Sequence, residues 1–146
     1  MGGGTLNTCP TGIHCILEIS GCPFTLLDNE TFVKDSIEQA SQTALSTLLS
    51  LTSHKFEPQG VTALGLLAES HISIHTWPEQ GYAAVDIFTC GETANPQKAC
   101  KFLVKSFQAK KHTLLVVPRG QNQSQATSPM DAPQRAMETG RAGNAS

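Results

Sequence analysis

The chain lacks any stretch that approaches the ~20 consecutive apolar residues of a membrane-spanning helix. Its start, Met1-Gly2-Gly3-Gly4-Thr5, lacks the basic region and apolar run of a secretory signal. We therefore expect a cytoplasmic protein that does not enter a membrane. An excess of basic residues is also missing. The formal net charge is −2, which argues against a partner made of nucleic acid.

Cysteine pairs with the spacing of a metal site are absent as well. The five cysteines include no Cys-x-x-Cys, so a zinc site built from them is not expected. In a reducing compartment they should be free thiols, and most of them should be buried as small apolar residues. The chain has no Gly-x-Ser-x-Gly elbow of a serine hydrolase and no glycine-rich phosphate loop.

What the chain does contain is a series of strand and helix patterns that fit one domain in 146 residues. Alternation, apolar runs and turn residues predict strands over residues 12–20, 60–68, 71–77, 82–90 and 112–117. A first helix should follow Asp28 and Asn29, with an apolar stripe from Val33 to Leu48. A second should start at Asn95-Pro96 and reach Phe107.

This order of elements, β-α-β-β-β-α-β, predicts an α+β two-layer sandwich, a mainly antiparallel sheet with two helices on one face. The other face of the sheet carries polar and aromatic positions, and we expect a second copy of the chain to cover it. From Arg119 onward the chain has no Val, Ile, Leu, Phe, Tyr or Trp. We therefore expect a domain over residues 1–119 and a disordered tail over residues 120–146.

Chemistry is concentrated in two neighbouring stretches, residues 69–79 and 86–91. Ser70 follows Glu69 at the start of a strand, His71 and His75 share one face of that strand, and Cys90 lies on the next strand. A single hairpin should thus bring together a nucleophile, a base and a proton donor. Ser70 and His75 are an odd number of positions apart, so on a regular strand their side chains would point to opposite faces. They can come together only if the backbone is distorted at Ser70.

A metal site is the other interpretation of the two histidines on this strand. His71 and His75 could share a metal with Glu79. The strand pattern explains their common face without a metal, so no metal ligand is predicted.

The stretch resembles the short prokaryotic type of S-adenosylmethionine decarboxylase proenzyme, whose hallmark is Glu-Ser-His followed by Ile-His-Thr-Trp-Pro-Glu. The resemblance spans about residues 10–118. It implies that the bond between Glu69 and Ser70 breaks, leaving chains 1–69 and 70–146. Ser70 then becomes a pyruvoyl group, the covalent cofactor. His75 matches the family's processing histidine, and Thr62 stands where the family usually has a serine hydroxyl.

The chemistry implied by the resemblance can be followed atom by atom. The Ser70 hydroxyl attacks the carbonyl of Glu69, the peptide becomes an ester, and loss of the Ser70 Cα proton to His75 expels Glu69. The ketone that remains forms a Schiff base with the amino group of the substrate and accepts electrons as CO₂ leaves. Cys90 matches the family's catalytic cysteine, and a thiol can return a proton to the α-carbon.

The implied substrate is S-adenosylmethionine, whose decarboxylated form donates the aminopropyl group of spermidine. Phe56 and Trp77 match positions that contact the adenosyl part, and Glu79 matches a position that could hold the ribose hydroxyls. The expected assembly is a homodimer of cleaved two-chain protomers. Two alternatives remain open: a pyruvoyl-dependent arginine or ornithine decarboxylase of the same fold, and a non-catalytic paralogue.

Overall fold

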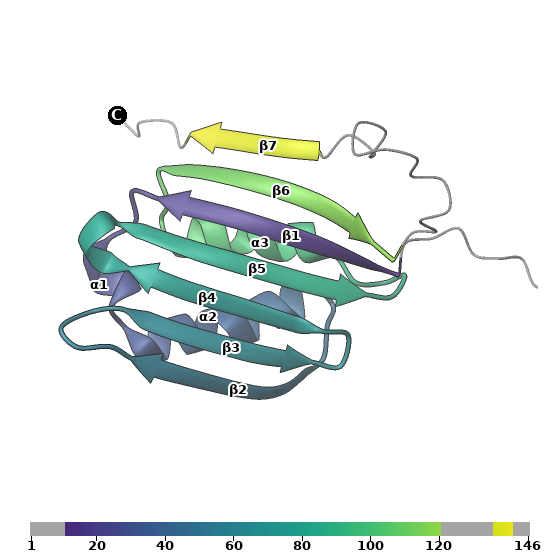
Figure 1. Cartoon of the computed structure of the whole chain (residues 1–146), viewed down its shortest axis with the longest axis horizontal. Helices are drawn as coiled ribbons and strands as arrows, with labels where there is room; N and C mark the ends of the chain where they lie inside the picture. The colour runs from purple at the N-terminus through teal and green to yellow at the C-terminus, as the bar shows by residue number, and fades with distance from the viewer. Residues whose placement is uncertain (1–10, 121–135, 142–146) are drawn as a thin grey trace, which may run out of the picture.

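One antiparallel sheet with helices against one of its faces makes up the structure, a computed structural model that describes residues 11–120 and 136–141 (Figure 1). The strands are β1 (Gly12–Ser20), β2 (Leu48–Lys55), β3 (Val61–Leu67), β4 (His71–Trp77), β5 (Tyr82–Cys90), β6 (Lys111–Arg119) and β7 (Ala136–Arg141). The helices are α1 (Phe24–Leu27), α2 (Glu30–Thr43), the 3₁₀ turn η1 (Pro78–Gln80) and α3 (Pro96–Ser106).

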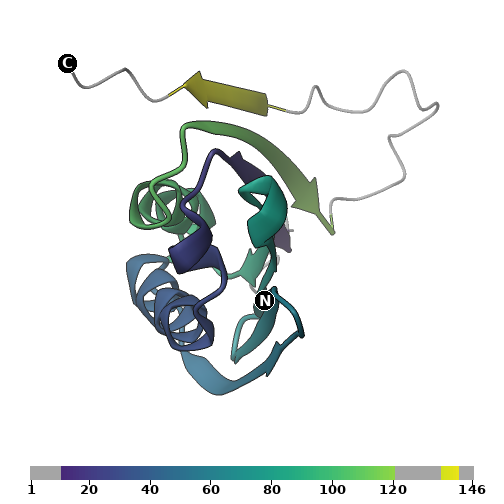
Figure 2. The ribbon, with the colours of Figure 1, turned by 90° about the vertical axis from the view of Figure 1, so that its left-hand side faces the viewer.

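The strands are ordered β2-β3-β4-β5-β1-β6-β7, and each pairs antiparallel with its neighbours. The first strand therefore lies between β5 and β6, which come much later in the sequence. Helices α2 and α3 lie on one side of the sheet and leave the opposite face open (Figure 2). The α+β two-layer sandwich predicted from the sequence is confirmed.

The core lies between the two long helices and the sheet. Both helices begin where the capping residues predict: Asn29 accepts a hydrogen bond from the Phe32 amide, and Asn95 accepts one from the Lys98 amide. The largest fully buried side chains include Phe107, Leu17, Ile19, Leu27, Ile37, Ile72, Ile74, Ile87 and Leu103. Full burial of one such side chain contributes about 1.5–3 kcal/mol, so this layer stabilises the sheet that presents the open face.

Strand β2 is the main difference from the sequence prediction. Helix α2 ends at Thr43, Leu45 has a positive φ of 58°, and Leu48 begins a strand. The prediction of a helical stripe as far as Leu48 was wrong because Leu48 follows Ala44 at the four-residue spacing of a helix. Its side chain packs against the same core, but from an edge strand.

The tail also differs from the prediction where the structure describes it. Residues 136–141 form β7, which pairs with β6 from Lys111 to Val116. An edge strand offers a row of free backbone N–H and C=O groups, and these can pair with an extended segment that has few apolar side chains. The rest of the predicted disordered tail, residues 121–135 and 142–146, lies outside the described residues.

Two contacts fix the β3–β4 hairpin, which with its turn carries most of the candidate site residues. A Cβ added at Gly65 of β3 would lie 2.6 Å from Ile37 Cγ2, so helix α2 sits directly on the strand at this glycine. The buried Thr76 hydroxyl of β4 donates to the Leu27 carbonyl at 2.7 Å and accepts from the Val61 amide at 2.9 Å. The hairpin is thus held at its middle and at its far end.

Candidate active site

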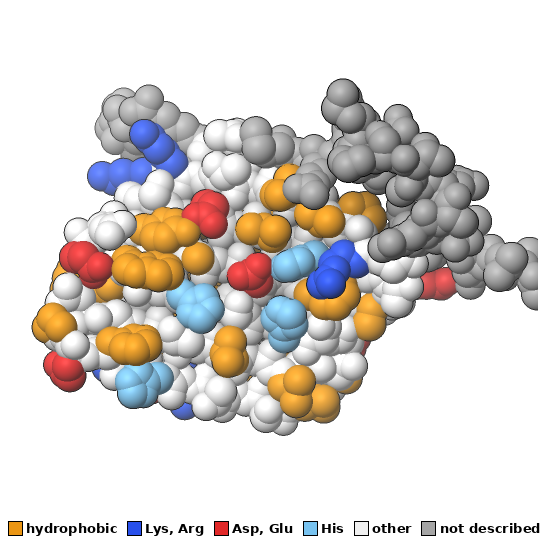
Figure 3. Space-filling model, viewed as in Figure 1, with side chains coloured by type: hydrophobic (Ala, Val, Ile, Leu, Met, Phe, Trp, Pro, Cys, Tyr) orange, Lys and Arg blue, Asp and Glu red, His pale blue; other side chains and the backbone are white. Residues whose placement is uncertain are grey.

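The open face of the sheet carries the residues that the sequence singled out. Figure 3 shows histidines and apolar side chains mixed on this face. The four histidines belong to three strands: His14 to β1, His54 to β2, and His71 and His75 to β4. The register places Thr62 opposite His75 and Phe88 opposite His71 on the same face. Leu64 and Leu66 are 45% and 53% exposed there, and no described element covers them.

Glu69 and Ser70 lie in the turn between β3 and β4. The turn is closed by the Leu67 amide, which donates to the Ser70 carbonyl at 2.9 Å, and the Glu69 carboxylate accepts from the Thr47 amide at 3.1 Å. Ser70 lies just before the strand, as its parity requires. A left-handed backbone is not found at this turn; the non-glycine residues with positive φ in the described chain are Leu45 and Gln108. The distortion expected at Ser70 is therefore not a left-handed residue.

Cys90 lies at the end of β5, beside the bond between Glu69 and Ser70. Its thiol donates a hydrogen bond to the Glu69 carbonyl oxygen at 2.8 Å. This is the carbonyl carbon that a Ser70 hydroxyl would attack, so the thiol is positioned to stabilise the developing oxyanion.

The other described cysteines, Cys15, Cys22 and Cys100, are buried, whereas Cys90 is half-buried. Burial raises the pKa of the Cys22 thiol to about 11. A hydrogen bond with Cys15 and burial raise the pKa of the Cys100 thiol. These two remain protonated at neutral pH and are inert as nucleophiles, as expected for structural thiols.

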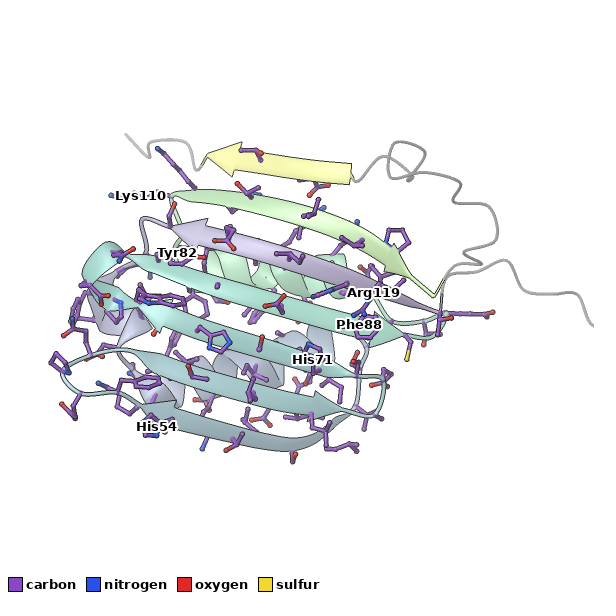
Figure 4. The ribbon with its side chains drawn as sticks, viewed as in Figure 1. His54, His71, Tyr82, Phe88, Lys110 and Arg119 are labelled. Atoms are coloured by element: carbon purple, nitrogen blue, oxygen red, sulfur yellow. The ribbon has the colours of Figure 1, made fainter. Side chains whose placement is uncertain are left out.

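A group of rings surrounds the start of β4 (Figure 4). The Ser70 Oγ lies 3.3 Å from His71 Nδ1. The Phe88 ring lies beside His71, with centroids 6.1 Å apart, and the Arg119 guanidinium lies 4.7 Å above Phe88. A Cβ at Gly12 would be 2.5 Å from Phe88 Cε2, so the missing side chain at Gly12 makes room for this ring.

His14 belongs to the same group, and sequence reasoning missed it. Its Nε2 lies 3.0 Å from Asp86 Oδ1, and its ring is 5.8 Å from Phe88. No local signal could have joined residues 72 positions apart, because the pairing of β1 with β5 was not predicted. His71, in contrast, stands next to Ser70 in the sequence, so adjacency alone pointed to it.

His75 lies further along β4, paired with Thr62. His75 Nδ1 is 2.9 Å from Thr62 Oγ1. His75 is four positions after His71, which corresponds to about 13 Å along a strand. The structure therefore brings Ser70 together with Cys90, but it does not bring His75 to Ser70 within one chain.

Phe56, Trp77 and Glu79 gather at the end of the sheet away from Ser70. Phe56 follows β2, Trp77 ends β4, and Glu79 lies in η1. Phe56 is 46% exposed and Trp77 is 39% exposed. Gln59, in the loop after Phe56, donates to the Glu79 carboxylate at 3.4 Å and links the two loops.

Tyr82 lies under the Trp77 ring, with centroids 5.2 Å apart. Its hydroxyl donates to the Glu18 carboxylate. Partial burial and this carboxylate raise the pKa of Tyr82 to about 12, so the phenol remains neutral. A neutral aromatic pair therefore faces solvent at this end of the sheet.

Comparison with known proteins identifies the family. The sequence profile of the S-adenosylmethionine decarboxylase family matches residues 13–120. The chain belongs to this family. The S-adenosylmethionine decarboxylase proenzyme of Prochlorococcus marinus (strain MIT 9211) is 57% identical over 108 residues, 74% of this chain and 88% of the relative. That of Methanococcus aeolicus is 47% identical over 109 residues, 75% of this chain and 93% of the relative.

A solved structure agrees with the S-adenosylmethionine decarboxylase assignment. The crystal structure of the adenosylmethionine decarboxylase from Aquifex aeolicus VF5 matches with a TM-score of 0.74 and 32% identity. The match covers 82% of this chain and 99% of that chain. Every candidate site residue falls inside the range that the S-adenosylmethionine decarboxylase profile matches.

In this S-adenosylmethionine decarboxylase family member, the described residues contain neither a metal-site cluster nor a membrane-spanning helix. Over residues 11–120 and 136–141, no three His, Cys, Asp or Glu side chains are grouped so that they could hold a metal ion. Across the same ranges, no helix is long and apolar enough to cross a membrane.

Proposed function

We propose that this chain cleaves itself between Glu69 and Ser70 into chains 1–69 and 70–146, and that the product decarboxylates S-adenosylmethionine. The contact that carries the proposal is the 2.8 Å hydrogen bond from the Cys90 thiol to the Glu69 carbonyl oxygen. Family membership supports the activity, and the proenzyme names of the relatives support the cleavage.

The cleavage requires an N-to-O acyl shift followed by removal of the Ser70 Cα proton. In the first step the Cys90 thiol donates to the oxygen that becomes negative, which lowers the barrier in the way that an oxyanion hole does. In the second step His75 acts as the base. His75 Nδ1 lies 2.9 Å from Thr62 Oγ1. In the tautomer that the proposal requires, Nδ1–H donates to Thr62 and Nε2 carries the lone pair that accepts the proton.

The residues around Ser70 fit a pyruvoyl group formed from that serine. Such a group supplies a carbonyl that accepts the electron pair released when CO₂ leaves. The Cys90 thiol, already in contact with the residue that precedes Ser70, then lies next to the substrate α-carbon and can donate the proton that replaces CO₂. A reactive thiol persists in a reducing compartment, and we therefore place the enzyme in the cytoplasm.

A second copy of the chain is needed to complete the site. Ser70 and Cys90 lie at one end of the open face, His75 and Thr62 near the middle of it, and Trp77 at the other end. The six residue-to-residue steps from His71 to Trp77 span about 20 Å of strand. A two-fold axis across the strands reverses their direction, so the Trp77 end of one copy lies over the Ser70 end of the other.

The face that would be covered in such a homodimer has the composition of an interface. Leu64, Leu66 and Phe56 are exposed on or beside it, and half-buried Leu115 and Val117 extend it across β6. Large apolar patches with a polar rim mark interaction surfaces. We therefore propose a face-to-face homodimer with two sites, each of which takes Ser70 and Cys90 from one chain and the remaining residues from the other.

The adenosyl group distinguishes S-adenosylmethionine from the two alternative substrates, arginine and ornithine. Arginine and ornithine have no aromatic ring, whereas the exposed rings of Phe56 and Trp77 offer stacking surfaces for adenine. The Glu79 carboxylate nearby can accept hydrogen bonds from ribose hydroxyls. The non-catalytic alternative is disfavoured because Ser70, Cys90 and the Thr62–His75 pair are all present.

A substrate panel with intact mass measurement tests the proposal. The purified protein should consist of two chains, 1–69 and 70–146, the second with a blocked N-terminus. It should release CO₂ from S-adenosylmethionine and at least 100-fold more slowly from arginine or ornithine, because neither fills the aromatic end of the site. A protein that stays a single chain, or that prefers arginine or ornithine, would contradict the proposal.

Replacement of Cys90 tests its two expected roles separately. Cys90→Ala should lose about 100-fold in decarboxylation because no thiol remains to protonate the product carbon, and its cleavage should also slow. Cys90→Ser is the matched control, since its hydroxyl can still donate to the Glu69 carbonyl. It should cleave well and decarboxylate poorly. The assignment fails if Cys90→Ala decarboxylates S-adenosylmethionine at the wild-type rate.

A further inference from the structure

Among residues 11–120 and 136–141, the Ser70 hydroxyl has one hydrogen-bond partner, a histidine to which the proposed site gives no role. Ser70 Oγ lies 3.3 Å from His71 Nδ1. His75, the histidine assigned to cleavage, lies about 13 Å further along β4. The cleavage has two proton transfers at Ser70, one from the hydroxyl and one from Cα, and the second is the one assigned to His75.

We propose that His71 is a catalytic residue of self-cleavage, the base that takes the Ser70 hydroxyl proton during the N-to-O acyl shift. The inference deepens the proposed function and rests on its cleavage step. It assigns the two proton transfers to two histidines: His71 of the same chain for the first, and His75 of the partner copy for the second.

The step balances without any further reactant. The Ser70 Oγ–H bond gives its proton to His71 Nδ1 as Oγ bonds to the Glu69 carbonyl carbon. The carbonyl electron pair moves onto the Glu69 oxygen, where the Cys90 thiol donates its hydrogen bond. When that oxygen re-forms its double bond, the bond from carbon to the Ser70 nitrogen breaks, and the nitrogen takes the proton back from His71. The products are an ester and a free amine on Ser70.

The surroundings of His71 hold its ring where this transfer needs it. The Phe88 ring lies beside it, and Phe88 is itself fixed between the space left by Gly12 and the Arg119 guanidinium 4.7 Å above. The His14 ring meets the His71 ring edge to face at 6.4 Å, and His14 is held by Asp86 at 3.0 Å. The imidazole is exposed, so water reaches it in a single chain and a partner copy can cover it.

The ester intermediate distinguishes the proposed roles of the two histidines, because His71 would act before it forms and His75 after it. Hydroxylamine splits esters far faster than amides, so it reports whether Ser70 has already attacked. We expect His71→Ala proenzyme, made by cell-free translation, to stay intact and to resist hydroxylamine, with the acyl shift slowed about 100-fold. The His75→Ala proenzyme should also stay intact but should split with hydroxylamine, because its ester forms and then stalls.

Three further variants and additions decide what His71 does. Added imidazole should restore cleavage to His71→Ala, since it can replace the missing base. His71→Asn retains a hydrogen-bond acceptor near the position of Nδ1 but no base, and it should remain as slow as His71→Ala. His112→Ala is the matched histidine deletion; His112 lies on β6 against the helix side of the sheet, and its loss should leave cleavage unchanged.

The possible failures are distinguishable. If the wild-type chain does not cleave, the proposed function fails. If the wild type cleaves and His71→Ala cleaves at the same rate, only the role of His71 is overturned. If His71→Asn matches the wild type, His71 orients the hydroxyl and is not the base, which also overturns the inference. A thermal unfolding midpoint close to that of the wild type shows for each variant that the fold is intact.

Discussion

Ser70→Ala should remain a single chain of 146 residues with no measurable decarboxylase activity. The hydroxyl is the only nucleophile that the turn between β3 and β4 offers to the Glu69 carbonyl, and a methyl group cannot attack. Without cleavage no carbonyl group forms at this position, so the loss extends to the whole reaction. Direct hydrolysis of the peptide bond is too slow to substitute for it.

Denaturing electrophoresis and CO₂ release from S-adenosylmethionine measure the two parts of this result. Ser106→Ala is the matched control, because Ser106 ends α3 on the far side of the core and its loss should change neither readout. Detection of the two chains in Ser70→Ala preparations, at the position of the wild-type products, would remove Ser70 from the chemistry. Ser70→Cys offers a graded test, since its thiol can attack the same carbonyl.

Ser70→Ala and His75→Ala should each be inactive alone and should recover activity when they are expressed together. In the proposed homodimer each site takes Ser70 from one chain and His75 from the other. A mixed dimer of these variants therefore contains one intact site and one site that lacks both residues. With random pairing, the activity should reach about a quarter of the wild-type value in a two-fold symmetric assembly.

The matched control is the pair Ser70→Ala and Cys90→Ala. In the proposed site both residues come from one chain, in keeping with the Cys90 contact to the Glu69 carbonyl, so no mixed dimer restores them to a single site. This pair should stay at or below the activity of Cys90→Ala alone, about 100-fold below the wild type. Separate affinity tags on the two chains, followed by mass measurement of each, identify which chain is cleaved. The proposed sharing of sites is wrong if Ser70→Ala with Cys90→Ala recovers decarboxylase activity. It is also wrong if Ser70→Ala with His75→Ala recovers none.

The sheet and its two long helices could be predicted because their signals are local. Alternation over β4 and β5 and the capping residues Asn29 and Asn95 each depend on a few neighbouring positions. Strand β2 was missed because the spacing of Ala44 and Leu48 imitates a helix, while the positive φ of Leu45 that ends the helix has no glycine to mark it.

The sequence was enough to predict which candidate residues of β4 share a face, but not how the candidate residues are arranged on the sheet. Parity along β4 correctly placed His71, His75 and Trp77 on one face. It carries no information on how far apart residues lie along a strand, and the expectation that one hairpin joins Ser70 and His75 was therefore wrong for a single chain. Contacts such as that of His14 with Asp86 depend on the order of strands in the sheet, which no short stretch of sequence encodes.

The position of β1 between β5 and β6 has a consequence for the mature protein. A cut after Glu69 assigns β1, β2 and β3 to one fragment and the other four strands to the second, and the two sets interleave. The fragments remain locked together while the fold persists, although no covalent bond joins them. Once they unfold, they must find each other in solution, so regain of structure becomes a second-order process that dilution slows. After cleavage, the stability of such an enzyme would depend on how slowly it unfolds, because the separated fragments refold poorly.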